Sequence, residues 1–184
     1  MSQPEFSRPV DVTTIAPDGL VRTIEAKPDE LRELARRLEL LAIDRLSATL
    51  RLRRVRGGEM VEVSGEIDAD VVQACVVTLE PVRGRVQDSF EELFAPPHLV
   101  PEFDPDEEVD LAVLEGMPEP IENGRIDLGE MVAQNLSLSL DPYPRAPGVP
   151  FVGNEEEAPE AKTQEEGEER RNPFAALAKL KRSH

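Results

Sequence analysis

The feature that most constrains the fold is a pair of alternating segments on either side of Gly57-Gly58. Each segment alternates apolar side chains with polar ones: the first has Ala48, Leu50 and Leu52 on one face, and the second has Val61, Val63 and Ile67. A period of two is typical of a strand with one buried face. Two adjacent glycines supply the positive φ that a tight turn needs. The pattern therefore predicts a β-hairpin from strands 47–55 and 60–69.

The chain after this hairpin predicts further strands of the same sheet. Residues 71–79 are almost continuously apolar, which favours a strand covered on both faces, with Cys75 buried in its middle. Residues 81–84 carry turn chemistry, and 85–94 alternate in part. We therefore expect an antiparallel meander of three or four strands.

The N-terminal region predicts a second pair of strands. Residues 8–14 alternate, and Pro17-Asp18-Gly19 is suited to a turn because Pro fixes φ and Gly accepts φ > 0. We expect residues 20–26 to return as the next strand.

Two helices are predicted from their start signals. Pro28 opens the first with two acids behind it, and its apolar face consists of Leu31, Leu34, Ala35 and Leu38. Asp127 begins the second as the first residue of a capping box, in which Glu130 is expected to reach back to the Asp127 backbone. Asp141-Pro142 ends it, because the residue before proline avoids helical backbone angles.

These elements predict an α+β fold: an antiparallel meander or partly closed sheet with two packed helices, all within one domain, residues 1–150. Six prolines and many acids mark 95–125 as a long acidic excursion, with one short strand or helix expected around Val109 to Leu114. Residues 151–171 are expected to form a disordered acidic linker and 172–184 a short amphipathic basic segment, so that the chain ends in a mobile acidic tail.

Charge and composition exclude several function classes. The formal net charge of −17 in 184 residues opposes generic binding of nucleic acid by the whole molecule. No apolar run approaches the roughly 20 residues of a membrane span, and we expect a soluble cytoplasmic protein. A single cysteine, Cys75, rules out an internal disulfide and a multi-cysteine metal cage. Pairing of Cys75 with His98 would need the Pro96-Pro97 loop to fold back over the sheet. We expect no catalytic residues, metal, cofactor or small-molecule substrate.

Two groups of residues are candidates for contacting a partner. The first is the arginine group Arg51, Arg53, Arg54 and Arg56 in and after the first hairpin strand, which suits phosphate or carboxylate. Its alternative is pairing with the chain's own acids. The second is the C-terminal segment, with Phe174 and Leu177 as apolar anchors beside Lys179 and Lys181. So short a helix is unstable alone, so it is expected either to anchor a partner or to dock on its own domain.

Several segments in a fixed order resemble the YceD family, the large-ribosomal-RNA-subunit accumulation proteins. They are Gly65 onward to Cys75-Val76-Val77-Thr78-Leu79-Glu80-Pro81, Phe90 to Phe94 with Pro96, Ile126-Asp127-Leu128-Gly129-Glu130, Leu136 to Pro144, and Asn172-Pro173-Phe174 with the residues up to Lys181. The resemblance extends over most of the chain from Leu31 on. It implies a role in synthesis, processing or stability of 23S-type ribosomal RNA. Many relatives carry Cys-x-x-Cys, whereas this chain has Thr78 in place of the second cysteine.

The leading hypothesis is a non-catalytic factor in large-subunit biogenesis whose partner is a ribosomal protein of the large subunit, ribosomal RNA, or both. The acidic tract from Asp88 to Glu130 would shield a basic ribosomal protein, whereas the arginine group would touch RNA. The alternatives are an RNA-processing enzyme, which would need a convergent site that the sequence lacks, and a metal- or redox-linked regulator, which Thr78 disfavours because threonine is a poor zinc ligand.

Overall fold

The computed structural model describes residues 4–101 and 117–149. The strands are β1 Pro9–Asp11, β2 Leu20–Glu25, β3 Ala42–Val55, β4 Met60–Ala74, β5 Pro81–Ala95, β6 Glu119–Pro120 and β7 Arg125–Asp127. The helices are α1 Pro28–Arg37 and α3 Leu128–Ser139, and short 3-10 turns are η1 Val12–Thr14, η2 Arg56–Gly58 and η3 Pro97–Leu99. The predicted α+β class is confirmed.

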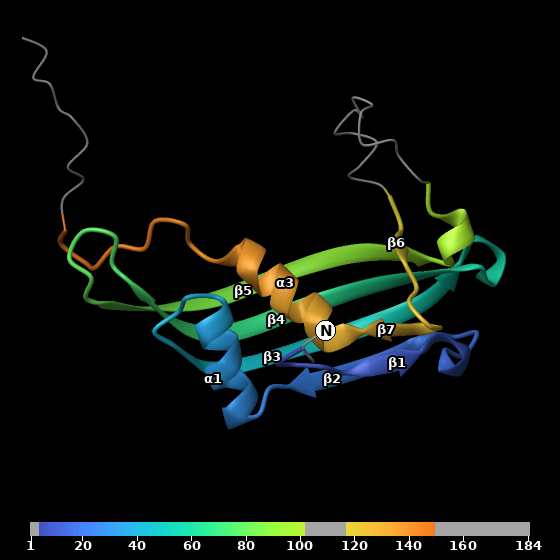
Figure 1. Cartoon of the computed structure of the whole chain (residues 1–184), viewed down its shortest axis with the longest axis horizontal. Helices are drawn as coiled ribbons and strands as arrows, with labels where there is room; N and C mark the ends of the chain where they lie inside the picture. Colours follow the sequence, from blue (N-terminus) through green and yellow to red (C-terminus); the bar gives the residue numbers. More distant parts are fainter. Residues whose placement is uncertain (1–3, 102–116, 150–184) are drawn as a thin grey trace, which may run out of the picture. The chain divides into compact units, whose positions relative to one another are not determined.

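The main sheet is a five-stranded, open and mostly antiparallel meander in the order β2-β3-β4-β5-β6 (Figure 1). Its centre is the hairpin of β3 and β4, which stay in register from Arg45↔Asp70 to Val55↔Met60. The turn η2 holds Gly57 at φ 74°, so the predicted glycine hairpin is confirmed. At the far edge β6 pairs in parallel with the end of β5, and so the chain that leaves the sheet after Ala95 returns to its edge.

The expected strand over residues 71–79 is wrong. β4 continues as one strand to Ala74, and residues 75–80 turn the chain, closed by hydrogen bonds from Cys75 N to Glu80 O and from Leu79 N to Cys75 O. Cys75 therefore lies in the turn and not in mid-strand. Pro81 begins β5 and does not turn the chain, because the first residue of a strand tolerates a missing N–H. The apolar residues of 71–79 could not show where the strand ends, because a turn with apolar side chains has the same sequence pattern as a buried strand.

The expected pairing of the two N-terminal strands is also wrong. β1 pairs with β7, with Val10 opposite Ile126, and forms a separate two-stranded sheet. The Pro17-Asp18-Gly19 turn closes only the bridge Ala16↔Gly19, and β2 pairs along β3 instead. The strand at 8–14 is shorter than predicted because η1 follows Asp11 directly.

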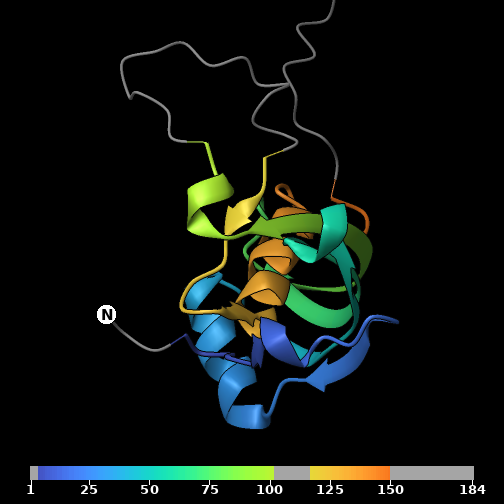
Figure 2. The same ribbon diagram turned by 90° about the vertical axis from the view of Figure 1, so that its right-hand side faces the viewer.

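Both helices lie on one face of the main sheet, whose strands curve around α3 (Figures 1 and 2). Helix α1 buries Leu34 and Ala35 there, as its predicted apolar face requires. Helix α3 contributes Met131, Val132 and Leu136 to the same core. In the described part of the chain no helix covers the opposite face, and this asymmetry positions the candidate site.

The start of α3 is fixed by Asp127 and by the N-terminal segment. The Asp127 carboxylate accepts the backbone N–H of Gly129 at 3.0 Å, as the predicted cap requires, and also that of Arg8 at 2.7 Å. The other half of the predicted capping box is not formed, because the Glu130 carboxylate instead pairs with both terminal nitrogens of Arg37 at 2.8 and 2.6 Å. A helix-to-helix ion pair has replaced a local hydrogen bond.

Other predicted elements lie outside the described residues. They are the short element around 109–114, the linker 151–171 and the segment 172–184, with its candidate contacts Phe174, Leu177, Lys179 and Lys181.

Candidate functional site

The candidate site is the uncovered side of the main sheet, which we call the open face. Its side chains come from alternate positions of β2 to β5 and line up across the strands. One row consists of Thr23, Thr49, Glu66 and Ser89. The next row consists of Glu25, Ser47, Asp68 and Gln87. Both rows carry hydroxyl, amide and carboxylate groups and no large apolar side chain.

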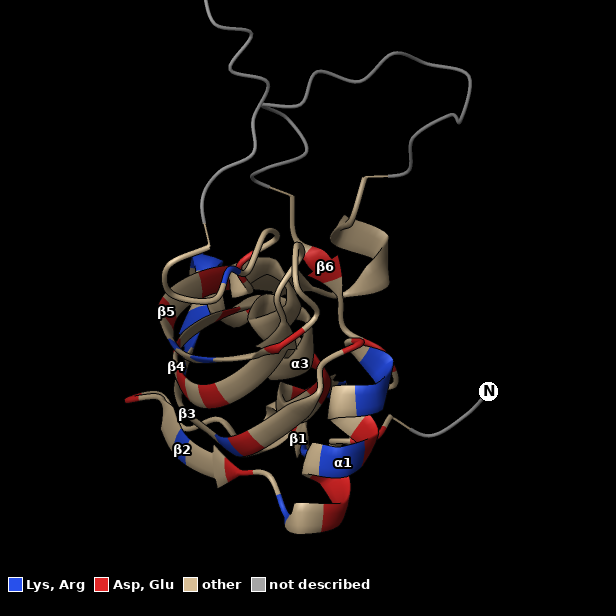
Figure 3. Ribbon diagram, turned by 90° about the vertical axis from the view of Figure 1, so that its left-hand side faces the viewer, with Lys and Arg blue, Asp and Glu red and all other residues tan. Residues whose placement is uncertain are grey.

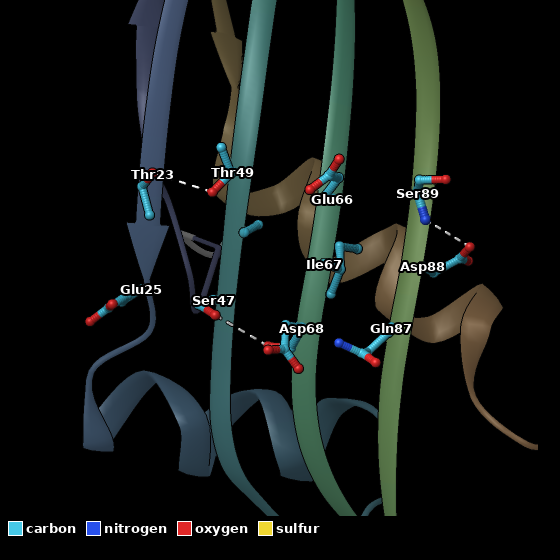
Figure 4. Close-up of a pocket in the computed structure, with 11 residues that line it drawn as sticks. Thr23, Glu25, Ser47, Thr49, Glu66, Ile67, Asp68, Gln87, Asp88 and Ser89 are labelled. Atoms are coloured by element: carbon cyan, nitrogen blue, oxygen red, sulfur yellow. Dashed lines mark hydrogen bonds between the residues drawn. The ribbon is translucent and has the colours of Figure 1, made fainter.

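These rows line a shallow depression of about 670 Å³ (Figure 4). Its polar groups are held by hydrogen bonds within the sheet: the hydroxyl oxygens of Thr23 and Thr49 are 3.3 Å apart, and the Ser47 hydroxyl donates to the Asp68 carbonyl at 3.4 Å. Because Thr49, Ser47 and Asp68 stand on the central strands β3 and β4, the backbone ladder fixes their positions. The depression can therefore offer acceptor groups at fixed spacing.

Asp68 is the one carboxylate of this depression that is strongly neutralised by arginines within the described residues. Arg85 and Arg45 approach it at 2.8 and 2.9 Å, and Arg45 also reaches Asp70 at 3.0 Å. The hydrogen bond from Arg85, followed by that from Arg45, lowers the pKa of Asp68 to about 2. This carboxylate stays ionised at any ordinary pH, and its two arginines are occupied by it.

Three other carboxylates of the open face have no such partner. Glu25, Glu66 and Glu91 are exposed, and no basic side chain of the described chain forms an ion pair with any of them. Sequence analysis placed Glu91 within the acidic tract from Asp88 to Glu130 but did not identify Glu25 or Glu66. The signal was present in β4, where Glu62, Ser64, Glu66, Asp68 and Asp70 occupy alternate positions opposite the apolar ones.

The four predicted contact arginines do not share one surface, although Arg51 and Arg53 both lie on the open face. Arg53 lies on the open face but pairs with Glu62 at 2.5 Å. Arg51 is exposed on the same face, and no ion pair joins it to another described residue. Arg56 is exposed in η2, beyond the end of β3, with φ 49°.

Arg54 has a structural role that the sequence did not reveal. Its guanidinium donates to three backbone carbonyls, those of Val12 at 2.7 Å, Gly58 at 3.1 Å and Ile15 at 3.2 Å. These bonds fasten the η1 segment to the β3–β4 turn. Arg54 therefore has few donors left for a partner.

Internal pairing of arginine extends to helix α1. Arg32 bonds to Asp29, and Arg36 lies 2.8 Å from Glu33, so both signs of charge alternate along the exposed side of the helix (Figure 3). Exposed pairs of this kind contribute little to stability, typically ~0.3–0.5 kcal/mol each. Their main effect is to remove free positive charge from this surface.

Cys75 is buried, as predicted, and its sulfur accepts hydrogen bonds. The Ala146 N–H donates to Sγ at 3.4 Å. Bonds from the Thr78 hydroxyl and from the N–H groups of Ala146, Thr78 and Val77 lower the pKa of the thiol to about 6, against the opposing effect of burial. In the region the structure describes, no three His, Cys, Asp or Glu residues are grouped as metal ligands.

The structure does not bring Cys75 and His98 together. Cys75 precedes β5 and His98 follows it. A 15-residue strand separates them, which spans roughly 45 Å at ~3.3 Å per residue.

Within the described ranges no helix is long and apolar enough to span a bilayer.

Comparison with known proteins gives one match. No curated protein and no solved structure matches the chain. Residues 63–181 match the family described as "Large ribosomal RNA subunit accumulation protein YceD". The match begins in β4, later than the resemblance from Leu31 suggested, and extends through α3 into the C-terminal segment. Because it covers more than half of the 184 residues, the chain belongs to the YceD family.

Proposed function

We propose that this protein is a non-catalytic factor in the biogenesis of the large ribosomal subunit, and that it supports accumulation of 23S-type ribosomal RNA by binding a basic ribosomal protein on its open face. Family membership supports the link to large-subunit RNA. The choice of a protein partner is our inference from the charges of the open face. We place this activity in the cytoplasm, where such a partner is synthesised.

The observation that carries the proposal is the imbalance of charge on the open face. Glu25, Glu66 and Glu91 have no ion-pair partner in the described chain, whereas Arg53, Arg45 and Arg85 are each paired with a carboxylate. Arg51 is exposed on the same face without an ion pair to a described residue, so the three unpaired carboxylates still outnumber it. Carboxylates beside hydroxyl acceptors suit the N–H donors of lysine and arginine. Phosphates would meet the same carboxylates with repulsion, and the net charge of −17 adds to it.

The test neutralises the three carboxylates together, as Glu25→Gln, Glu66→Gln and Glu91→Gln. Since an exposed ion pair contributes ~0.2–1 kcal/mol, we expect binding to a basic large-subunit protein to weaken roughly 3- to 150-fold. The measurement is fluorescence anisotropy with individually purified large-subunit proteins at low salt, and the level of large-subunit RNA in cells that depend on the variant.

The matched control neutralises three exposed acids that lie off the open face, as Asp18→Asn, Glu59→Gln and Glu122→Gln. Both triple variants change the net charge equally, so a difference between them reports on the face and not on overall charge. Equal binding by the two variants would contradict the proposal.

Direct contact with ribosomal RNA is the second candidate, and the exposed, unpaired position of Arg51 among the described residues favours it. Arg51→Ala is then expected to weaken binding to a purified ribosomal RNA fragment and leave protein binding unchanged. The segment 172–184, with Phe174, Leu177, Lys179 and Lys181, remains a proposed further contact on the basis of its sequence.

A further inference from the structure

Four large apolar side chains are exposed on two adjoining segments at the end of the main sheet where β4 turns into β5. Val76, Val77 and Leu79 in the turn are 46%, 51% and 76% exposed, and Tyr143 on the following strap 140–149 is 70% exposed. The strap adjoins the turn, because Val76 N–H donates to the Pro144 carbonyl at 2.9 Å. We call these four side chains the apolar tip. Large apolar side chains exposed on adjoining segments are typical of interaction surfaces.

Leu79 is the residue that folding alone does not explain. Its φ of 61° lies in the left-handed region, where a residue such as Asn or Gly is less strained than leucine. Its side chain is the second most exposed large apolar one among the described residues. A leucine that is strained in backbone and unburied in side chain gains nothing within its own domain. Its side chain is therefore suited to an external contact.

The backbone of the tip is held by hydrogen bonds before it meets a partner. Two backbone hydrogen bonds close the turn, and the Cys75 sulfur accepts the Ala146 N–H of the strap. A preformed surface loses little conformational entropy on binding. Aromatic and bulky apolar residues held in this way are the usual anchors of an interface.

We propose that the apolar tip is a docking site for apolar side chains of a basic protein, a second contact besides the open face. This identification of the partner rests on the proposed function. The turn and the strap carry two acids, Glu80 and Asp141, and one base, Arg145. A molecule of charge −17 is repelled by an anionic membrane surface and by RNA, whereas a basic protein is attracted to it. The excess of acids near the tip therefore favours a basic protein as its partner over a membrane or RNA.

The decisive variant is Leu79→Asn. Asparagine accepts the left-handed backbone, so the melting temperature of the free protein is expected to stay the same or rise. Loss of an anchor side chain is expected to weaken binding to a purified basic large-subunit protein roughly tenfold or more. Because an apolar contact is insensitive to salt, this loss should persist at high ionic strength, where the contribution of the open face is screened. The control is Leu138→Asn, which removes a leucine that is 84% exposed on α3.

The outcomes separate this inference from the proposed function. If Leu79→Asn binds like the wild-type chain at high and low salt, the tip is not a docking site, whatever the open-face variants do. If the open-face variants bind normally but Leu79→Asn does not, the docking site at the apolar tip is supported and the proposal that the open face binds the partner is contradicted. If Leu138→Asn weakens binding as much as Leu79→Asn, the effect is not specific to the tip and the inference fails.

Discussion

Replacement of Gly129 by alanine should destabilise this protein, although a glycine in a helix usually gains from that change. Gly129 is the second residue of α3, where alanine is intrinsically favoured by up to ~1 kcal/mol. A Cβ built at this position would lie 2.1 Å from the carbonyl oxygen of Phe6 and 2.8 Å from its carbonyl carbon. Both are backbone atoms, so no side-chain rotation relieves the overlap. The N-terminal segment must move away from α3.

The size of the effect follows from what that movement exposes. Phe6 is fully buried, and loss of a buried phenylalanine side chain typically costs ~3–5 kcal/mol. After the gain in helix propensity, we expect a net loss of roughly 2–4 kcal/mol. At about 2–4 °C per kcal/mol, the melting temperature should fall by roughly 4–16 °C.

The assay is thermal unfolding followed by circular dichroism, with Gly84→Ala as the matched control. A Cβ at Gly84 would only make an ordinary contact, 3.8 Å from a Val71 methyl group. The coupling can be measured with Phe6→Ala, which should cost far less in the Gly129→Ala background than in the wild-type chain. A Gly129→Ala protein that melts at or above the wild-type temperature would refute the packing of the N-terminal segment on α3.

Three further expectations concern the arginines, the thiol and metal. Replacing Arg51 and Arg53 with alanine should weaken binding to a nucleic acid, such as a ribosomal RNA fragment, or to another acidic partner without unfolding the domain; unchanged affinity at low salt would leave both residues with internal roles only. The Cys75 thiolate, followed by its ultraviolet absorbance, should titrate near pH 6, and Thr78→Val should raise that pKa because the largest cause of its lowering is removed. Since the folded pKa lies below the unfolded value of 9.0, the thiolate's contribution to stability is complete above pH 9 and is lost as pH falls through about 6. The dialysed protein should carry no stoichiometric zinc; one zinc per chain by elemental analysis would contradict this.

Local signals predicted the elements whose cause is local. The cap at Asp127, the first turn after Pro28 and the hairpin at Gly57-Gly58 each depend on residues within a few positions of one another. The alternation in β3 also assigned Arg51 and Arg53 correctly to the side opposite the apolar residues. Turn chemistry and periodicity suffice for such features.

Features that depend on distant partners were not predictable in the same way. Nothing near Val10 indicates that it will lie opposite Ile126. Nothing in the sequence around Arg54 indicates that its guanidinium will donate to backbone carbonyls of the η1 segment. Glu130 fits the local pattern of a capping box, but in the structure its carboxylate pairs with Arg37 instead. The candidate site shows the same limit, because the isolation of Glu25 and Glu66 becomes visible only when four strands are placed side by side.

The pairing of β1 with β7 has a consequence for synthesis on the ribosome. Arg8 and Asp127, which are hydrogen-bonded in the folded protein, are 119 residues apart in the chain. At ~5–20 residues per second the N-terminal segment waits roughly 6–24 s for its partner to be made. During that interval the meander of β2 to β5 can pair while Phe6 has no helix to cover it. The segment around Phe6 is thus among the last parts of the fold to reach its native position, and in the nascent chain the Phe6 side chain lacks its native cover until α3 has been synthesised.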